Sequence, residues 1–72
     1  MQKGRDQLIA RCIVLAFGIE ETQRILESMH AGNLYAKNAR DILILEGIRD
    51  GKTLEQIDDS LFEAEFPTLS TG

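Results

Sequence analysis

Few side chains of this sequence could carry out covalent or metal chemistry. Cys12 is the only cysteine and His30 the only histidine in 72 residues, so one chain can form neither an internal disulfide nor a zinc site of cysteine and histidine ligands. Cys12 falls on an apolar stripe, where a cysteine more commonly packs than reacts. His30 could act as a general base, but a histidine near a helix C-terminus more commonly faces the helix dipole or a loop. We therefore predict that the protein is not an enzyme.

A group of acidic residues near the C-terminus could suggest a cation site. Its members are Asp58, Asp59, Glu63 and Glu65. Calcium loops place their oxygen ligands on a turn-rich segment that contains glycine, whereas these carboxylates fall on a stretch with helical spacing and face several directions. We interpret them as a solvated acidic face, and we expect neither a metal nor a cofactor.

Charge is distributed unevenly along the chain. Residues 1–45 contain six Lys or Arg and five Asp or Glu, a net charge of +1, whereas residues 46–72 contain two and seven, a net charge of −5. Duplex DNA is bound mainly through contacts of Lys and Arg with phosphates, so the second part has the wrong sign for that role. The basic residues of the first part could form only a modest patch, too small to bind a duplex alone but able to touch phosphates if the starts of the two hairpins align: Lys3, Arg5, Arg11, Arg24, Lys37 and Arg40.

The spacing of apolar residues predicts an all-α fold, a small bundle of four helices in two hairpins. The first hairpin spans residues 5–31, the second spans 38–65, and residues 66–72 form a tail with room for a short fifth turn. We expect the first helix to run from about Arg5 to Phe17, to include Val14 and Leu15 in its apolar stripe, and to be central. The second helix should end at Gly32 with these residues facing inward: Ile19, Thr22, Ile25, Leu26 and Met29.

Capping residues mark the boundaries of the second hairpin. Asn38 can cap the third helix, Gly51 can end it in a left-handed conformation, and Thr53 with Gln56 forms a capping box for the fourth helix. The residues of the fourth helix predicted to be buried are Leu54, Ile57, Leu61 and Phe62. Leu34 and Tyr35 should anchor the loop between the hairpins, and Leu69 should fold back after Pro67.

The two hairpins resemble each other at an offset of 35 residues. The matching residues of the first hairpin are Arg5, Asp6, Leu8, Ile9, Ile13, Ile19, Glu20 and Leu26, and those of the second are Arg40, Asp41, Leu43, Ile44, Ile48, Leu54, Glu55 and Leu61. A period near 35 is a helical-repeat length, but a solenoid usually needs about three or more units. We interpret the similarity as that of two amphipathic hairpins that look alike because both must bury one apolar face in the same way. A true repeat is the alternative.

Three stretches together resemble a known family. "GRDQLIARCIVLAFGIEETQRIL", "NLYAKNARDILILEGI" and "TLEQIDDSLFEAEFPTL" are similar, in order and spacing, to the C-terminal helical part of phage-repressor-type (Xre-family) helix-turn-helix transcriptional regulators of Firmicutes. The resemblance covers Gly4 to Leu69. It implies that the base-reading helix of the family precedes the segment corresponding to Arg5, so we expect this chain to lack it. It also implies that Lys3 and Arg5 lie near the DNA backbone, as possible phosphate contacts. Gly18 stands where the family has a serine-type cap, and Ala16 stands near an expected glycine, so the first turn should differ.

These observations lead to two hypotheses about function. The first is a non-catalytic helical interaction or dimerisation module that contacts a protein partner or a second copy through Val14, Phe17, Leu34, Tyr35, Phe62 and Phe66. The second is direct DNA binding, with residues 38–61 acting as a helix-turn-helix. The apolar stretch at residues 8–17 is interrupted by Arg11 and is shorter than the roughly 20 residues of a membrane span. With a single cysteine and no signal-peptide pattern, we expect a cytoplasmic protein that does not enter a membrane.

Overall fold

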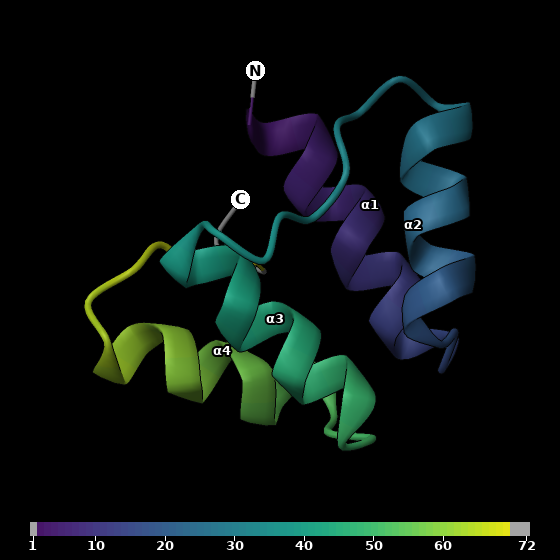
Figure 1. Cartoon of the computed structure of the whole chain (residues 1–72). Helices are drawn as coiled ribbons and strands as arrows, with labels where there is room; N and C mark the ends of the chain where they lie inside the picture. The colour runs from purple at the N-terminus through teal and green to yellow at the C-terminus, as the bar shows by residue number, and fades with distance from the viewer. Residues whose placement is uncertain (1, 70–72) are drawn as a thin grey trace.

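Four helices in two hairpins make up the part of the chain that the structure describes. The computed structural model describes residues 2–69, with α1 (Gln2–Val14), α2 (Ile19–Ser28), α3 (Ala39–Arg49) and α4 (Leu54–Glu63). Figure 1 shows α1 and α2 as one hairpin and α3 and α4 as the other. The all-α prediction is confirmed. Between residues 64 and 69 the chain makes a turn and then continues without a fifth helix.

The predicted caps of the second hairpin are present. Asn38 Oδ1 accepts a hydrogen bond from Asp41 N at 3.0 Å, which satisfies one free amide group at the start of α3. At the start of α4, Thr53 Oγ1 accepts from Gln56 N at 3.2 Å and Gln56 Oε1 accepts from Thr53 N at 3.0 Å, which completes the capping box. Gly18 begins α2 without a side-chain cap.

α1 ends three residues earlier than predicted. Ala16 adopts a left-handed conformation with φ 62°, and Phe17 N donates to Cys12 O at 3.0 Å. The equivalent bond in the second hairpin runs from Lys52 N to the α3 backbone at 2.9 Å, with Gly51 at φ 73°. This pattern of bonds closes a helix, and its left-handed residue is usually glycine. An alanine therefore ends α1 in the same way that a glycine ends α3.

The core lies between the two hairpins and is formed by residues from all four helices and both hairpin tails. Its buried apolar members are Ile9, Ile13, Leu26, Leu34, Ile44, Ile57, Leu61 and Leu69. Leu34 and Leu69 are thus buried as predicted. The apolar groups left exposed include Val14, Leu15, Met29 and Phe62, all of which were expected to face inward.

The exposure of these four apolar residues has two geometrical causes. Val14 and Phe62 directly follow Ile13 and Leu61, which are buried, and one step along a helix turns a side chain by about 100° away from the core. Leu15 and Met29 lie beyond the last residue of their helices, where helical spacing no longer applies. The prediction of an apolar stripe on these segments was correct, but the stripe is narrower and shorter than expected.

The two hairpins have the same local structure at a shift of 35 residues. This shift takes α2 onto α4 at both ends, because Ile19 corresponds to Leu54 and Ser28 to Glu63. It also relates the non-glycine residue His30, at φ 54°, to Glu65, at φ 64°. The tails after α2 and α4 are held alike: Leu34 N donates to Gln23 Oε1 at 2.8 Å, and Leu69 N donates to Asp58 Oδ1 at 2.8 Å. The two hairpins therefore share one local structure, which both a common solution to one packing problem and a true repeat predict.

Candidate functional site

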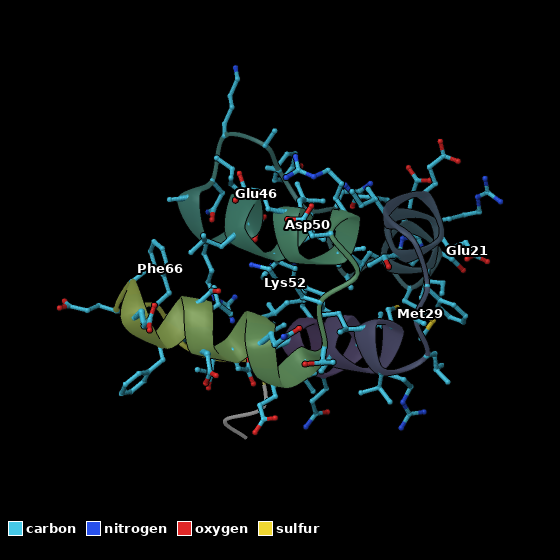
Figure 2. All side chains as sticks on the ribbon, turned by 90° about the horizontal axis from the view of Figure 1, so that it is seen from below. Glu21, Met29, Glu46, Asp50, Lys52 and Phe66 are labelled. Atoms are coloured by element: carbon cyan, nitrogen blue, oxygen red, sulfur yellow. The ribbon has the colours of Figure 1, made fainter. Side chains whose placement is uncertain are left out.

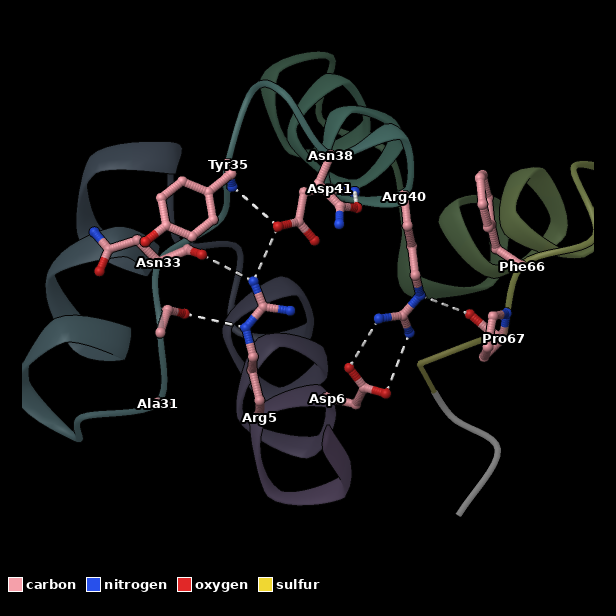
Figure 3. A pocket seen from close by; sticks show the side chains of 11 residues that line it. Arg5, Asp6, Ala31, Asn33, Tyr35, Asn38, Arg40, Asp41, Phe66 and Pro67 are labelled. Carbon is pink, nitrogen blue, oxygen red and sulfur yellow. Dashed lines mark hydrogen bonds and ion pairs between the residues drawn. The ribbon is translucent and has the colours of Figure 1, made fainter. Parts of the chain in front are cut away.

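Two reciprocal ion pairs join the hairpins. Arg5 Nη2 of α1 lies 3.0 Å from Asp41 Oδ2 of α3, and Arg40 of α3 makes a two-pronged contact with Asp6 of α1, at 3.1 and 3.2 Å. Figure 3 shows both pairs side by side. Arg5 corresponds to Arg40 and Asp6 to Asp41 under the 35-residue shift. The two halves therefore make the same contact in both directions, as the subunits of a two-fold symmetric dimer do.

Each arginine of these pairs also fastens the tail of its own hairpin. Arg5 Nε donates to Gly32 O at 3.1 Å, and its Nη2 donates to Asn33 O at 2.9 Å. Arg40 Nε donates to Pro67 O at 3.0 Å, which is the equivalent contact in the second hairpin. Each guanidinium thus has two tasks, to close its own hairpin and to bind the other one.

The predicted role of these arginines in phosphate binding is corrected by these contacts. The side chains of Arg5 and Arg40 are only 15% and 13% exposed; Nε and Nη2 of Arg5 and all three side-chain nitrogens of Arg40 donate to carboxylates or carbonyls. A phosphate would have to displace Asp6 from Arg40, and at Arg5 it would compete with the charge of Asp41. The side chain of Lys3, the third predicted phosphate contact, lies outside the described residues.

Asp41 is the most buried member of the four, with 5% of its side chain exposed. Its Oδ2 accepts from Arg5 and also from Tyr35 N at 2.9 Å. A carboxylate in this position needs both partners, because burial without them would cost several kcal/mol. The repeated Arg-Asp dipeptide is the signal in the sequence that could have revealed these ion pairs.

A cavity of about 640 Å³ opens beside the ion pairs. Its walls include the four charged side chains together with Asn33, Asn38 and the aromatic ring of Tyr35 (Figure 3). The charges are already paired across the cavity wall, so they neutralise one another. The arrangement suits a structural contact between the two hairpins.

A second cavity lies at the other ends of α1 and α3, where the turns of the two hairpins meet. We call it the turn groove, and its volume is about 560 Å³. Its apolar lining residues are Ile13, Val14, Ala16, Phe17, Ile48 and Leu54. Val14 is 68% exposed and Phe17 is half-buried, so both are accessible to another molecule. An apolar hollow of this kind can accept apolar side chains of a partner.

The six predicted interface residues do not form one surface. Val14 and Phe17 line the turn groove, whereas Tyr35 and Phe66 line the cavity beside the ion pairs. Phe62 is 75% exposed on α4 and lines neither cavity. Leu34 is corrected to a core residue, since the side chain of Gln23 binds its backbone N and O at 2.8 and 2.9 Å and holds it inside.

The acidic residues of the second half are mostly exposed, with one exception. Asp58 is buried and its Oδ1 accepts from Leu69 N, so it belongs to the tail and not to a solvated acidic face. The exposed carboxylates of α4 and the following turn are Glu55, Asp59, Glu63 and Glu65. Glu21, Glu46 and Asp50 add to the acidic surface (Figure 2).

Cys12 and His30, the residues with the most reactive side chains, lie in different surroundings. Burial raises the pKa of the Cys12 thiol, and the neighbouring Thr22 hydroxyl lowers it by less. Thr22 Oγ1 is itself buried without a hydrogen bond of good geometry, so its contact with the thiol is weak. His30 is exposed in the turn after α2 and lines neither of the two cavities. Within the described residues, no three His, Cys, Asp or Glu side chains are grouped so that they could hold a metal ion.

Comparison of the chain with protein-family models, with curated proteins and with solved structures found no match. Among the described helices, none combines the length and the apolar character needed to cross a membrane.

Proposed function

We propose that this chain is a non-catalytic helical interaction module, related to Xre-family transcriptional regulators, that binds a protein partner or a second copy of itself through the turn groove. The observation that carries the proposal is an apolar hollow with Val14 68% exposed at its edge. Burial of apolar surface is worth about 25 cal/mol per Å², so a partner that covers the groove gains free energy. A cytoplasmic location is part of the proposal, since the lone thiol of Cys12 is unpaired and buried.

The size of the protein supports a role in association. A chain of 72 residues buries only about 60% of its unfolded surface and has a thin stability margin. Val14 and Phe17 remain accessible although both are apolar. A partner that covers them would add to the stability of the folded state by mass action.

The alternative, direct DNA binding by residues 38–61, receives less support. α4 would be the base-reading helix of such a unit, yet it carries four acidic side chains and no Lys or Arg. Arg40, the residue expected to contact phosphate, is engaged by Asp6. We expect a titration with duplex DNA at low salt to show no binding, and a salt-sensitive affinity would favour the DNA-binding alternative.

Sedimentation velocity over a wide range of concentrations tests self-association through the groove. We expect the average mass to rise above 8.1 kDa with concentration, and Val14→Lys to keep the protein monomeric. Met29→Lys is the matched control, because Met29 is 63% exposed, lies at a helix end like Val14, and is outside the groove. A wild-type protein that stays monomeric at the highest concentrations, or an equal effect of both substitutions, would refute self-association at this site.

A further inference from the structure

We infer that the interface between the two hairpins is self-complementary and that two chains can exchange hairpins through it to form a dimer. In this dimer, the first unit (residues 2–34) of each chain packs on the second unit (residues 39–69) of the other. The inference rests on the proposed function, since it names a second copy of this chain as a partner, but the contacts that it uses are the ion pairs and the buried core between the units, which the turn groove only borders.

The first argument is the reciprocity of the contacts between the units. Arg5 binds Asp41 and Arg40 binds Asp6, so each unit offers the other one cation and one anion at equivalent positions. The apolar contacts follow the same rule, since Ile9 and its equivalent Ile44 are both fully buried in the shared core. An interface of this type is complementary to itself, which is the condition for two-fold association of identical units.

The second argument is that each unit is closed by its own residues. In the first unit, Arg5 holds Gly32 O and the side chain of Gln23 holds Leu34. In the second unit, Arg40 holds Pro67 O and Asp58 holds Leu69 N. None of these bonds crosses between the units. A unit can therefore leave its neighbour and keep the hydrogen bonds that shape its own tail.

The third argument is the linker. Tyr35, Ala36 and Lys37 are all exposed, and they connect Leu34, which is buried in the first unit, to Asn38, which caps α3 of the second. In this segment, Tyr35 N donates to Asp41 Oδ2 at 2.9 Å and Asn38 N donates to Tyr35 O at 3.1 Å. A short exposed linker of this kind is a suitable hinge for an exchange of domains.

In the wild-type chain, pairing within one molecule competes with exchange. A short linker gives the two units an effective concentration in the millimolar range, so the monomer dominates in dilute solution. Exchange becomes visible when pairing within one molecule is weakened and pairing between molecules is not. Two single substitutions can create this situation.

The test mixes the full-length variants Asp6→Arg and Arg40→Asp. Each variant alone places two like charges at the Asp6–Arg40 contact, whether it pairs within one chain or exchanges with its own copy. An exchanged dimer can contain one chain of each variant. One of its interfaces then has the arginine introduced at position 6 opposite the aspartate introduced at position 40, and the other has the native pair of Asp6 and Arg40. Sedimentation velocity of the equimolar mixture, refolded together, should show a 1:1 dimer at least about tenfold more abundant than in either variant alone.

A matched control carries both substitutions in one chain. This double variant restores opposite charges within the molecule, so it should be as monomeric as the wild type at the same concentration. If one single variant does not fold alone, circular dichroism still gives an answer, because helical signal must return on mixing. A mixture that remains monomeric, or that remains unfolded, overturns the inference.

Adding Val14→Lys to both mixed chains separates this inference from the proposed function. The exchanged dimer should persist, since Val14 is 68% exposed and is not a member of the buried core between the units, whereas association through the turn groove should be lost. Loss of the mixed dimer on this addition would assign it to the groove and refute exchange.

Discussion

Replacing Gly47 by alanine should destabilise the protein when residue 57 is isoleucine and stabilise it when residue 57 is alanine. Gly47 is buried in α3 and faces Ile57 of α4. A Cβ atom added at Gly47 would lie 2.8 Å from Ile57 Cδ1 and still closer to Cγ1. The equivalent positions in the first hairpin hold Cys12 and Thr22. Cys12 is larger than Gly47 and Thr22 is smaller than Ile57, so the size lost on one helix is gained on the other.

The magnitude follows from two opposing terms. In an open helix, Gly→Ala stabilises by about 1 kcal/mol. At Gly47 the added methyl group must displace the buried side chain of Ile57, and because it would come within 3 Å of two atoms of that side chain, the cost falls in the upper half of the range for overpacking, about 2–3 kcal/mol. We expect Gly47→Ala to lower the free energy of unfolding by about 1–2 kcal/mol. In an Ile57→Ala background the obstacle is gone, and the same change should raise it by about 1 kcal/mol.

Urea unfolding of the four proteins in this cycle, followed by circular dichroism, measures the coupling directly. Ile57→Ala alone should cost about 2–5 kcal/mol, so all four are compared in the same sucrose concentration to keep them folded. The expected coupling energy between the two sites is about 2–3 kcal/mol. A Gly47→Ala variant that is as stable as the wild type, or a coupling energy near zero, would refute the close contact between these two residues.

Three further outcomes are expected. Ala16→Gly should raise the free energy of unfolding by about 0.5–1 kcal/mol, because alanine is strained at φ 62°, and Gly51→Ala should lower it by a similar amount; equal responses of the same sign in urea would contradict the shared turn geometry. Thr22→Val should stabilise by about 1 kcal/mol, since it removes a buried hydroxyl that lacks a good partner, and a destabilised variant in thermal unfolding would count against that assignment. Because burial raises the pKa of Cys12 in the folded state, the folded chain holds that proton more tightly than the unfolded chain, so stability should fall as pH rises past the ordinary thiol pKa. The difference between wild type and Cys12→Ala over that pH range isolates this effect, and an unchanged difference would contradict it.

Much of the fold could be predicted because the second hairpin carries its boundaries in its residue types. Asn38, Gly51 and Thr53 each occupy the position that their chemistry favours, and the helices begin and end beside them. The first hairpin lacks such residues. Ala16 takes the left-handed conformation without being glycine, so nothing in its residue type marked the end of α1.

The exposed and buried faces were harder to predict, because they depend on where each helix meets the other hairpin. Phe62 is apolar and adjoins the core residue Leu61, yet it faces solvent. Asp58 is charged and sits on an acidic helix, yet it is buried by its bond to Leu69 N. In both cases, whether the side chain is exposed or buried depends on where another segment of the chain lies. The spacing of residues along one helix does not reveal that position.

The arginines show how a repeat changes the interpretation of a charged residue. Considered alone, Arg5 and Arg40 are exposed cations near helix starts, and phosphate is a reasonable ligand. Considered as equivalent positions of two units, the two Arg-Asp dipeptides can face each other across a two-fold relation, and the observed contacts are reciprocal in this way. The cation of one unit then meets the anion of the other, at 3.0 and 3.1 Å here, so each arginine is largely neutralised by an aspartate. When the same dipeptide of opposite charges occurs twice, 35 residues apart as here, an ion pair between the two units is a better interpretation than a contact with nucleic acid.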